Sequence, residues 1–148
     1  MDAATRALLE NILRREARSL LQYVSQSFPW TTADEEQALV RLQELVREQS
    51  RAVGALSQFY ARREHTVPYL GSFPSSFTTI NFVSLDHLLP LLAEAERQSL
   101  EQLERDVTKL TDPEAREVVQ KMVELKRSHL STLKTLTTSH PEAASTAH

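Results

Sequence analysis

Apolar residues recur with a helical period in four long stretches of the chain. The spacing predicts helices over about residues 3–28, 33–65, 85–110 and 113–138. Each predicted helix has one apolar stripe and an opposite polar side, so the stripes can be buried against one another. Only two glycines occur in the whole chain, which also suits long helices. We therefore expect an all-α protein.

Residues that start or stop helices agree with these limits. Pro29 ends the first helix because it cannot donate the N–H that the next turn needs. Thr32 and Glu35 form a capping-box pattern that starts the second helix. Pro113, at a first helical position, opens the fourth. Pro90 lies past the first turn of the third helix, so we expect that helix to begin later or to bend there.

The lengths of the connections predict how the helices are arranged. About four residues or fewer separate the helices of each pair, which favours two antiparallel hairpins. The second helix would be roughly 50 Å long, and residues 66–84 can extend roughly 60 Å. We expect one four-helix-bundle domain over residues 1–138, with these residues as a long crossover between the hairpins. The small, polar residues 139–148 are predicted to be a disordered tail.

The predicted crossover is apolar rather than charged. Residues 66–84 contain no Asp, Glu, Lys or Arg, and three of the five phenylalanines lie there. We expect its apolar side chains to contact an apolar surface: Phe73, Phe77, Ile80 and Phe82. That surface is either the chain's own bundle or a second copy of the chain. We favour a homodimer, because the apolar strip would otherwise remain partly wet.

Composition and charge exclude several classes of function. The chain has no cysteine, which excludes disulfides, zinc fingers, iron–sulfur clusters and thiol catalysis. The net charge of −3 argues against a nucleic-acid binder. No stretch approaches the ~18 apolar residues of a membrane span, and the N-terminus lacks a secretory pattern. We therefore expect a cytoplasmic protein with no nucleic-acid or membrane partner, and an unknown protein partner stays open.

Polar side chains interrupt the apolar stripes at one level of the predicted bundle. Because each helical residue advances about 100° around its axis, the stripe centres can be located from the sequence. The polar residues at or beside these centres are Glu16, Gln49, Glu96, Lys126 and His129. A buried ionisable group is costly unless it is paired. We therefore predict that these side chains form one buried polar network.

This pattern, together with the expected topology, resembles the ferritin-like superfamily in the style of rubrerythrin and bacterioferritin. Those bundles hold a di-iron centre with Glu on one helix and Glu-x-x-His on the next, repeated in both hairpins. Here Glu16 precedes Gln49 by 33 residues, and Glu96 precedes Lys126 by 30 residues. Both separations are similar to the within-hairpin spacing of the family. The resemblance covers about residues 3–138 at the level of topology.

The resemblance implies that ligands are retained at Glu16, Glu96 and His129. Three further ligand positions are changed: they are Gln49, Ala52 and Lys126. Two hard cations need several anionic ligands to offset their charge, so di-iron activity is not transferred to this chain. We predict instead that Lys126 takes the place of a metal and pairs with Glu16 and Glu96. Such a network would fix the helix register while adding little net stability.

Three functions remain open from the sequence. The first is a structural or interaction module, a ferritin-like bundle that has lost di-iron catalysis and needs no cofactor. The second is a metalloprotein that holds a single Fe, Mn or Zn ion at Glu16, Glu96 and His129, with oxidoreductase-type activity. The third is a small-molecule binder with an apolar cavity between its helices. We favour the first and lean against enzymatic activity.

Overall fold

The computed structural model describes residues 1–139 and is built from helices. The longer ones are α1 (Ala3–Ala17), α3 (Glu36–Glu64), α4 (Leu85–Lys109) and α5 (Pro113–Thr138). The shorter ones are α2 (Leu20–Val24) and two 3-10 helices, η1 (Ala33–Glu35) and η2 (Ser75–Ile80). The predicted all-α class is confirmed. The tail predicted to be disordered, residues 139–148, lies outside the described residues except for Ser139.

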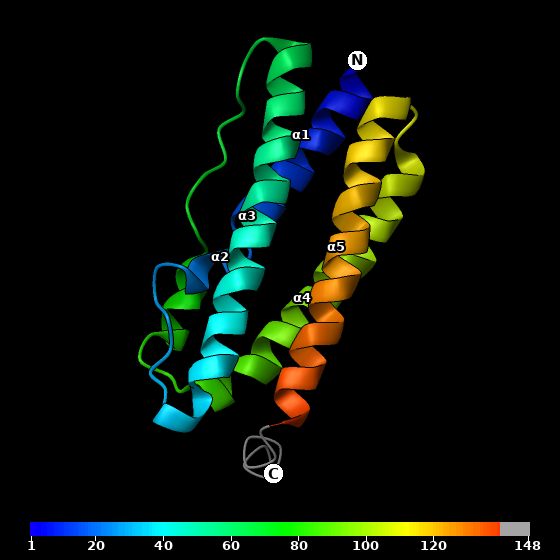
Figure 1. Cartoon of the computed structure of the whole chain (residues 1–148). Helices are drawn as coiled ribbons and strands as arrows, with labels where there is room; N and C mark the ends of the chain where they lie inside the picture. The colour runs from blue at the N-terminus through cyan, green and yellow to red at the C-terminus, as the bar shows by residue number, and fades with distance from the viewer. Residues whose placement is uncertain (140–148) are drawn as a thin grey trace.

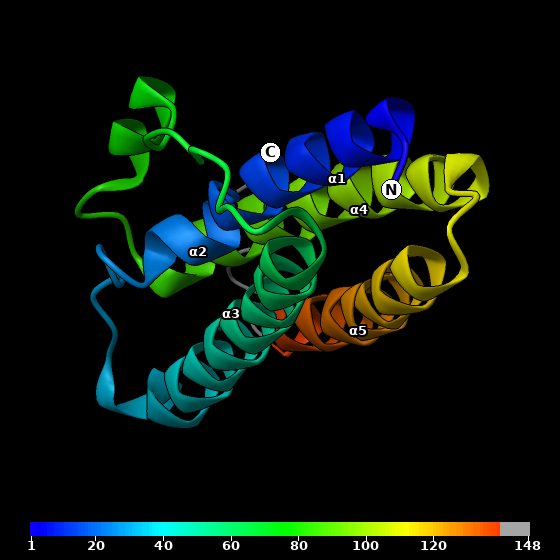
Figure 2. The same cartoon turned by 90° about the horizontal axis from the view of Figure 1, so that it is seen from above.

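The long helices pack side by side. In Figure 1, α3 runs from the lower to the upper end, and the chain then returns along the outside to the lower end, where α4 begins. α4 and α5 form an antiparallel pair, and α3 packs on both α1 and α5. α1 and α2 lie along the remaining side, where α2 packs on α3 and α4 (Figure 2). None of the helices in the described range has the length and apolarity that a membrane crossing requires.

The predicted helix over residues 3–28 is wrong in its second half, because the helix breaks. Arg18 leaves the helical conformation with φ −107° and ψ 20°. Ser19 then starts α2, since its Oγ accepts a hydrogen bond from the amide of Gln22 at 3.2 Å. The same hydroxyl donates to Oε1 of Gln49 on α3 at 3.1 Å. A serine that caps a new turn competes with continuation of the old helix, so the chain bends at this point.

The other helix limits lie close to those expected. The backbone N–H of Thr32 donates to Oε1 of Glu35 at 2.9 Å, which completes the predicted capping box before α3. α4 begins at Leu85 and continues through Pro90, so the later start that the proline suggested is wrong. The side chain of Ser84 caps this helix. Its first turns are also held by leucines that are fully buried: Leu85, Leu88 and Leu89.

The crossover from α3 to α4 is only partly packed on the bundle. Ile80 is buried, and the ring centroids of Phe73 and Phe77 lie 5.3 Å and 5.7 Å from that of Tyr23. Phe82, by contrast, is 92% exposed and has a left-handed backbone with φ 69°. Three of the four apolar side chains expected to need an apolar surface therefore find it in their own chain, and Phe82 does not.

The core is divided into two apolar clusters. The first joins α1, the C-terminal half of α3 and the paired parts of α4 and α5, and includes Leu9, Ile12, Leu56, Phe59, Tyr60 and Leu103. The second lies around α2, the N-terminal half of α3 and the start of α4, and includes Leu21, Val24, Leu42, Leu45, Leu88 and Leu92. Between them the helices carry buried polar residues instead. Gln49, for example, falls between Val46 of the second cluster and Leu56 of the first.

Candidate functional site

Lys126 forms the centre of the polar layer between the two apolar clusters. Its Nζ lies 2.7 Å from Oε2 of Glu16 on α1 and 3.2 Å from Oε2 of Glu96 on α4. None of these three side chains is more than 4% exposed. Charge-assisted hydrogen bonds in such a dry environment are strong. Removal of one partner would leave a buried charge without an opposite charge. The contact therefore ties α1, α4 and α5 together at one level.

Burial and pairing act in opposite directions on these groups. Burial raises the pKa of Glu96, and the nearby Lys126 ammonium opposes that rise only in part. For Lys126, burial would lower the pKa, but the attraction of Glu16 and Glu96 outweighs it and raises the pKa above its usual value. Lys126 is therefore charged across the neutral range, and it remains so into alkaline solution.

Two residues that sequence reasoning missed extend this network along α1 and α4. Nη2 of Arg15 lies 2.8 Å from Oδ2 of Asp106, and its Nε lies 3.6 Å from Oε1 of Glu16. Asp106 is only 3% exposed, and its other oxygen accepts from Gln102 at 3.0 Å. A signal for Asp106 was present, because it follows Leu103 by three residues on the apolar stripe of α4. Arg15, on the partly exposed edge of α1, gave no such signal.

Gln49 is buried at the same level but belongs to a different set of hydrogen bonds. Its Oε1 accepts from Oγ of Ser19 at 3.1 Å and from Nε2 of Gln22 at 2.9 Å. Gln49 thus connects the start of α2 to α3 by hydrogen bonds, and it does not hydrogen-bond to Lys126. Its own Nε2 is buried and has no hydrogen-bond partner among residues 1–139.

His129 is buried beside the network, but its ring is directed to another residue. Nε2 of His129 lies 3.0 Å from Oε2 of Glu48. This hydrogen bond lowers the pKa of Glu48, so the carboxylate is ionised and the ring nitrogen must be the donor. Glu48 is half-buried against His129, with 35% of its side chain exposed. A long side chain at the edge of a polar face can reach inward in this way.

A small cavity joins the predicted residues at the centre of the bundle. Its lining includes Glu16, Gln49, Glu96, Lys126 and His129. The cavity has a volume of about 10 Å³, which is enough for about one water molecule. Within residues 1–139, no group of three or more His, Asp or Glu side chains has an arrangement that could hold a metal ion. The single-metal site at Glu16, Glu96 and His129 stays a prediction.

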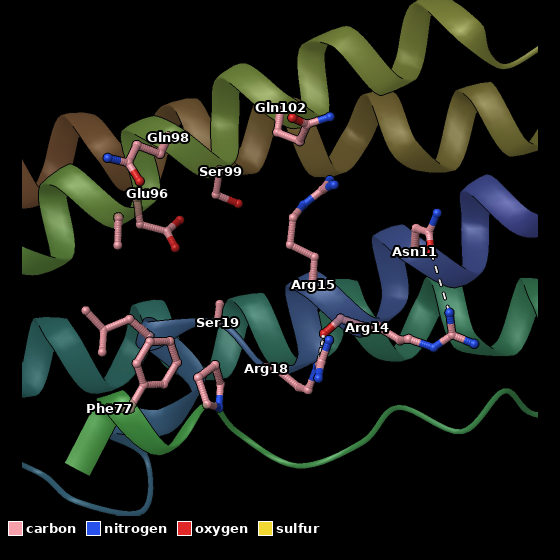
Figure 3. A pocket seen from close by; sticks show the side chains of 13 residues that line it. Asn11, Arg14, Arg15, Arg18, Ser19, Phe77, Glu96, Gln98, Ser99 and Gln102 are labelled. Atoms are coloured by element: carbon pink, nitrogen blue, oxygen red, sulfur yellow. Dashed lines mark hydrogen bonds between the residues drawn. The ribbon is translucent and has the colours of Figure 1, made fainter.

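A much larger pocket of about 620 Å³ lies next to this network, between the α1–α2 break, α4 and the crossover. In Figure 3, Arg15 reaches from α1 toward Gln102 on α4, and Ser19 faces Ser99 across the opening. Ser99 also donates to Oε1 of Glu16 at 3.0 Å, so the pocket wall and the buried network share residues. Sequence reasoning missed this pocket, because it forms where α1 breaks and where the crossover returns.

Comparison with known proteins does not assign the chain to a family. No family model matches its sequence, and neither curated proteins nor solved structures give a significant match. The described chain is therefore an all-α protein of about four major helices whose site must be interpreted from its own geometry.

Proposed function

We propose that the protein is a structural or interaction module, a bundle of ferritin-like design that has lost di-iron catalysis. The observation that supports this most directly is the contact of the Lys126 ammonium with the carboxylates of both Glu16 and Glu96. An ammonium between two carboxylates supplies the positive charge that a metal would otherwise supply. It also repels a further cation from the same place.

The remaining candidate ligands point to the same proposal. His129 donates to Glu48 through Nε2, so that nitrogen is not available to a metal unless the hydrogen bond breaks. Gln49 offers an amide in place of a carboxylate, and its oxygen already accepts from Ser19 and Gln22. The donors around Lys126 therefore suit an internal ion-pair network, and they do not suit a di-iron centre. Such a network would hold the helices in one register.

Metal analysis tests this proposal against the alternative of a single-metal protein. The chain would be expressed with iron, manganese and zinc supplied, and its metal content and thermal melting would be measured with and without a chelator. We expect less than stoichiometric metal and an unchanged melting temperature. Stoichiometric Fe, Mn or Zn that disappears in His129→Ala would overturn the proposal in favour of a metalloprotein.

The interaction part of the proposal concerns an apolar corner made by two neighbouring segments. Trp30 forms an isolated parallel bridge with Ser84, and its carbonyl accepts from the amide of Leu85 at 3.3 Å. Phe28 and Trp30 lie on one of the two bridged segments and Phe82 on the other. The exposed fractions are 40% for Phe28, 59% for Trp30 and 92% for Phe82. Because these segments present aromatic rings, the same corner of a second copy is a suitable partner through a two-fold axis. The proposed assembly is a homodimer.

Light scattering after size exclusion tests the homodimer. We expect a mass of twice the 16.8 kDa of the chain at high concentration, and a shift to the monomer in the double variant Trp30→Ser, Phe82→Ser. Val67→Ser serves as the control, because Val67 is 64% exposed at the opposite end of the crossover. A monomer at every concentration would remove this part of the proposal.

A further inference from the structure

We infer that the 620 Å³ pocket beside the α1–α2 break is a binding site for a small organic anion with an apolar body. Its volume lies within the range of small-molecule sites. It is lined by both charged and apolar side chains from three separated parts of the sequence, which are α1–α2, the crossover and α4. This inference does not depend on whether the buried Lys126 site holds a metal, because the guanidinium of Arg18, the group assigned to the ligand, donates to two backbone carbonyls outside that network.

The first argument comes from the three arginines that line the pocket, which differ in their partners. Nη2 of Arg14 lies 3.4 Å from the carboxylate of Glu10, and Nη2 of Arg15 lies 2.8 Å from that of Asp106. Arg18 forms no ion pair within residues 1–139, and its guanidinium donates only to two backbone carbonyls, at 3.1 Å and 3.5 Å. Arg18 therefore has unused donors at the pocket and a charge that no carboxylate in the described chain offsets.

Among residues 1–139, one acidic residue lines the pocket, and it does not cancel this charge. Glu96 borders the pocket, but its carboxylate is paired with Lys126 at 3.2 Å and is almost completely buried. Since Glu96 is held by Lys126 and Arg18 donates only to backbone carbonyls, Arg18 is the charged group of the lining that remains available to a ligand. A guanidinium of this kind recognises carboxylate and phosphate oxygens through paired hydrogen bonds.

Neutral polar groups and apolar groups complete the lining. Ser19 and Ser99 face each other across the opening. Their hydroxyl hydrogens are donated to Gln49 and Glu16, so the contact with an anionic group is left to Arg18. One wall is apolar and is formed by Leu20, Pro74 and Phe77. The ring of Phe77 is fixed against Tyr23 at 5.7 Å between centroids, so this wall is preorganised. The ligand class that fits both walls is an acid with an aromatic or aliphatic body.

Binding of three matched small molecules to the full chain tests the inference. Benzoate and phenyl phosphate have an anionic group on one ring, and benzyl alcohol has a similar ring without the charge. In calorimetric titrations we expect one saturable site for at least one of the two anions and clearly weaker binding of the alcohol. The preferred anion distinguishes a carboxylate ligand from a phosphate ligand. No saturable binding of either anion, or equal binding of the alcohol, would overturn the inference.

Substitution of Arg18 locates the site. We expect Arg18→Ala to weaken anion binding about tenfold, as loss of a charged hydrogen-bond donor does. The control is Arg51→Ala, which removes the same charge from an exposed position of α3 outside the pocket. Arg18→Gln removes the charge but keeps an amide donor, so it repeats the test if the alanine variant melts early. An equal loss of binding in the Arg18 and Arg51 variants would contradict the assignment.

Discussion

Charged side chains are paired in one region of the molecule, whereas one arginine in the region next to it forms no ion pair within residues 1–139. In the network around Lys126, buried carboxylates meet an opposite charge within 3.2 Å. In the pocket a few side chains away, Arg18 has only backbone carbonyls as partners. The two regions even share Glu96 as a wall. The two regions differ in their access to water. An uncompensated charge is tolerable in an open pocket and very costly in a dry core.

The comparison also separates stability from binding. The charged side chains of the buried network are already paired with one another, so they are not available to a ligand. Their removal should destabilise the fold. A charge left unmatched at the surface contributes little to the fold and is available to a partner. Substitutions in the two regions should therefore differ in which property they change.

The largest effect is expected for Lys126→Ala. The variant leaves Glu16 and Glu96 as two buried carboxylates without their common partner, so we expect a loss of roughly 3–5 kcal/mol in the free energy of unfolding. Denaturant unfolding followed by circular dichroism measures it. Lys121→Ala is the matched control on the same helix, because Lys121 is 72% exposed and should change stability by less than about 0.5 kcal/mol. Similar losses in both variants would contradict the account.

A smaller loss is expected at the other end of the network. Asp106→Ala removes the partner of Arg15 and of Gln102, and we expect a loss of about 1–3 kcal/mol in the free energy of unfolding. Arg15 is 30% exposed on its side chain, so it can recover solvent contact, which limits the cost. Asp106→Asn keeps an oxygen for Gln102 and should lose less. If the asparagine variant were as unstable as the alanine variant, the hydrogen bond to Gln102 would be unimportant.

Alkaline solution should weaken the fold through two buried groups. Burial and the hydrogen bond to Glu10 raise the pKa of Tyr60 from 10.0 to about 12, and pairing raises the pKa of Lys126 above 10.5. Above about pH 10 the unfolded chain loses these protons first, so the free energy of unfolding falls as the pH rises. Tyr60→Phe should remove the Tyr60 part of this fall and Lys126→Met the other part. Melting temperatures that stay constant to pH 12 would contradict both assignments.

The smallest effect on stability is expected in the pocket. Arg18→Ala should change the free energy of unfolding by less than about 0.5 kcal/mol, because a half-exposed arginine with only backbone partners contributes little. The same variant should show the loss of anion binding described above. A loss of stability comparable to that of Lys126→Ala would show that the two regions do not differ as proposed.

The helices that could be predicted from the sequence are those fixed by local signals. α3, α4 and α5 each combine an apolar stripe with a capping residue, and such signals act within a few residues. The break between α1 and α2 could not be predicted, because Ser19 is held by Gln49 on a helix 30 residues away. The helical spacing of apolar residues over 3–28 continues across the break, so the spacing alone predicts one uninterrupted helix.

The same distinction applies to the candidate site. Glu16, Glu96 and Lys126 could be identified because each lies on an apolar stripe, where an ionisable residue is unexpected. The partner of His129 could not, since Glu48 lies at the edge of its helix and only its side chain turns inward. The pocket was beyond sequence reasoning as well, because its walls depend on the helix break and on the path of the crossover.

The most direct test of the central claim compares two variants of the buried network. The claim is that Lys126 is needed because its ammonium is the common partner of Glu16 and Glu96 in a dry core. The triple variant Glu16→Gln, Glu96→Gln, Lys126→Met removes all three charges and keeps similar volumes, so its free energy of unfolding should exceed that of Lys126→Ala by several kcal/mol and approach the parent value. A triple variant no more stable than Lys126→Ala would contradict the claim.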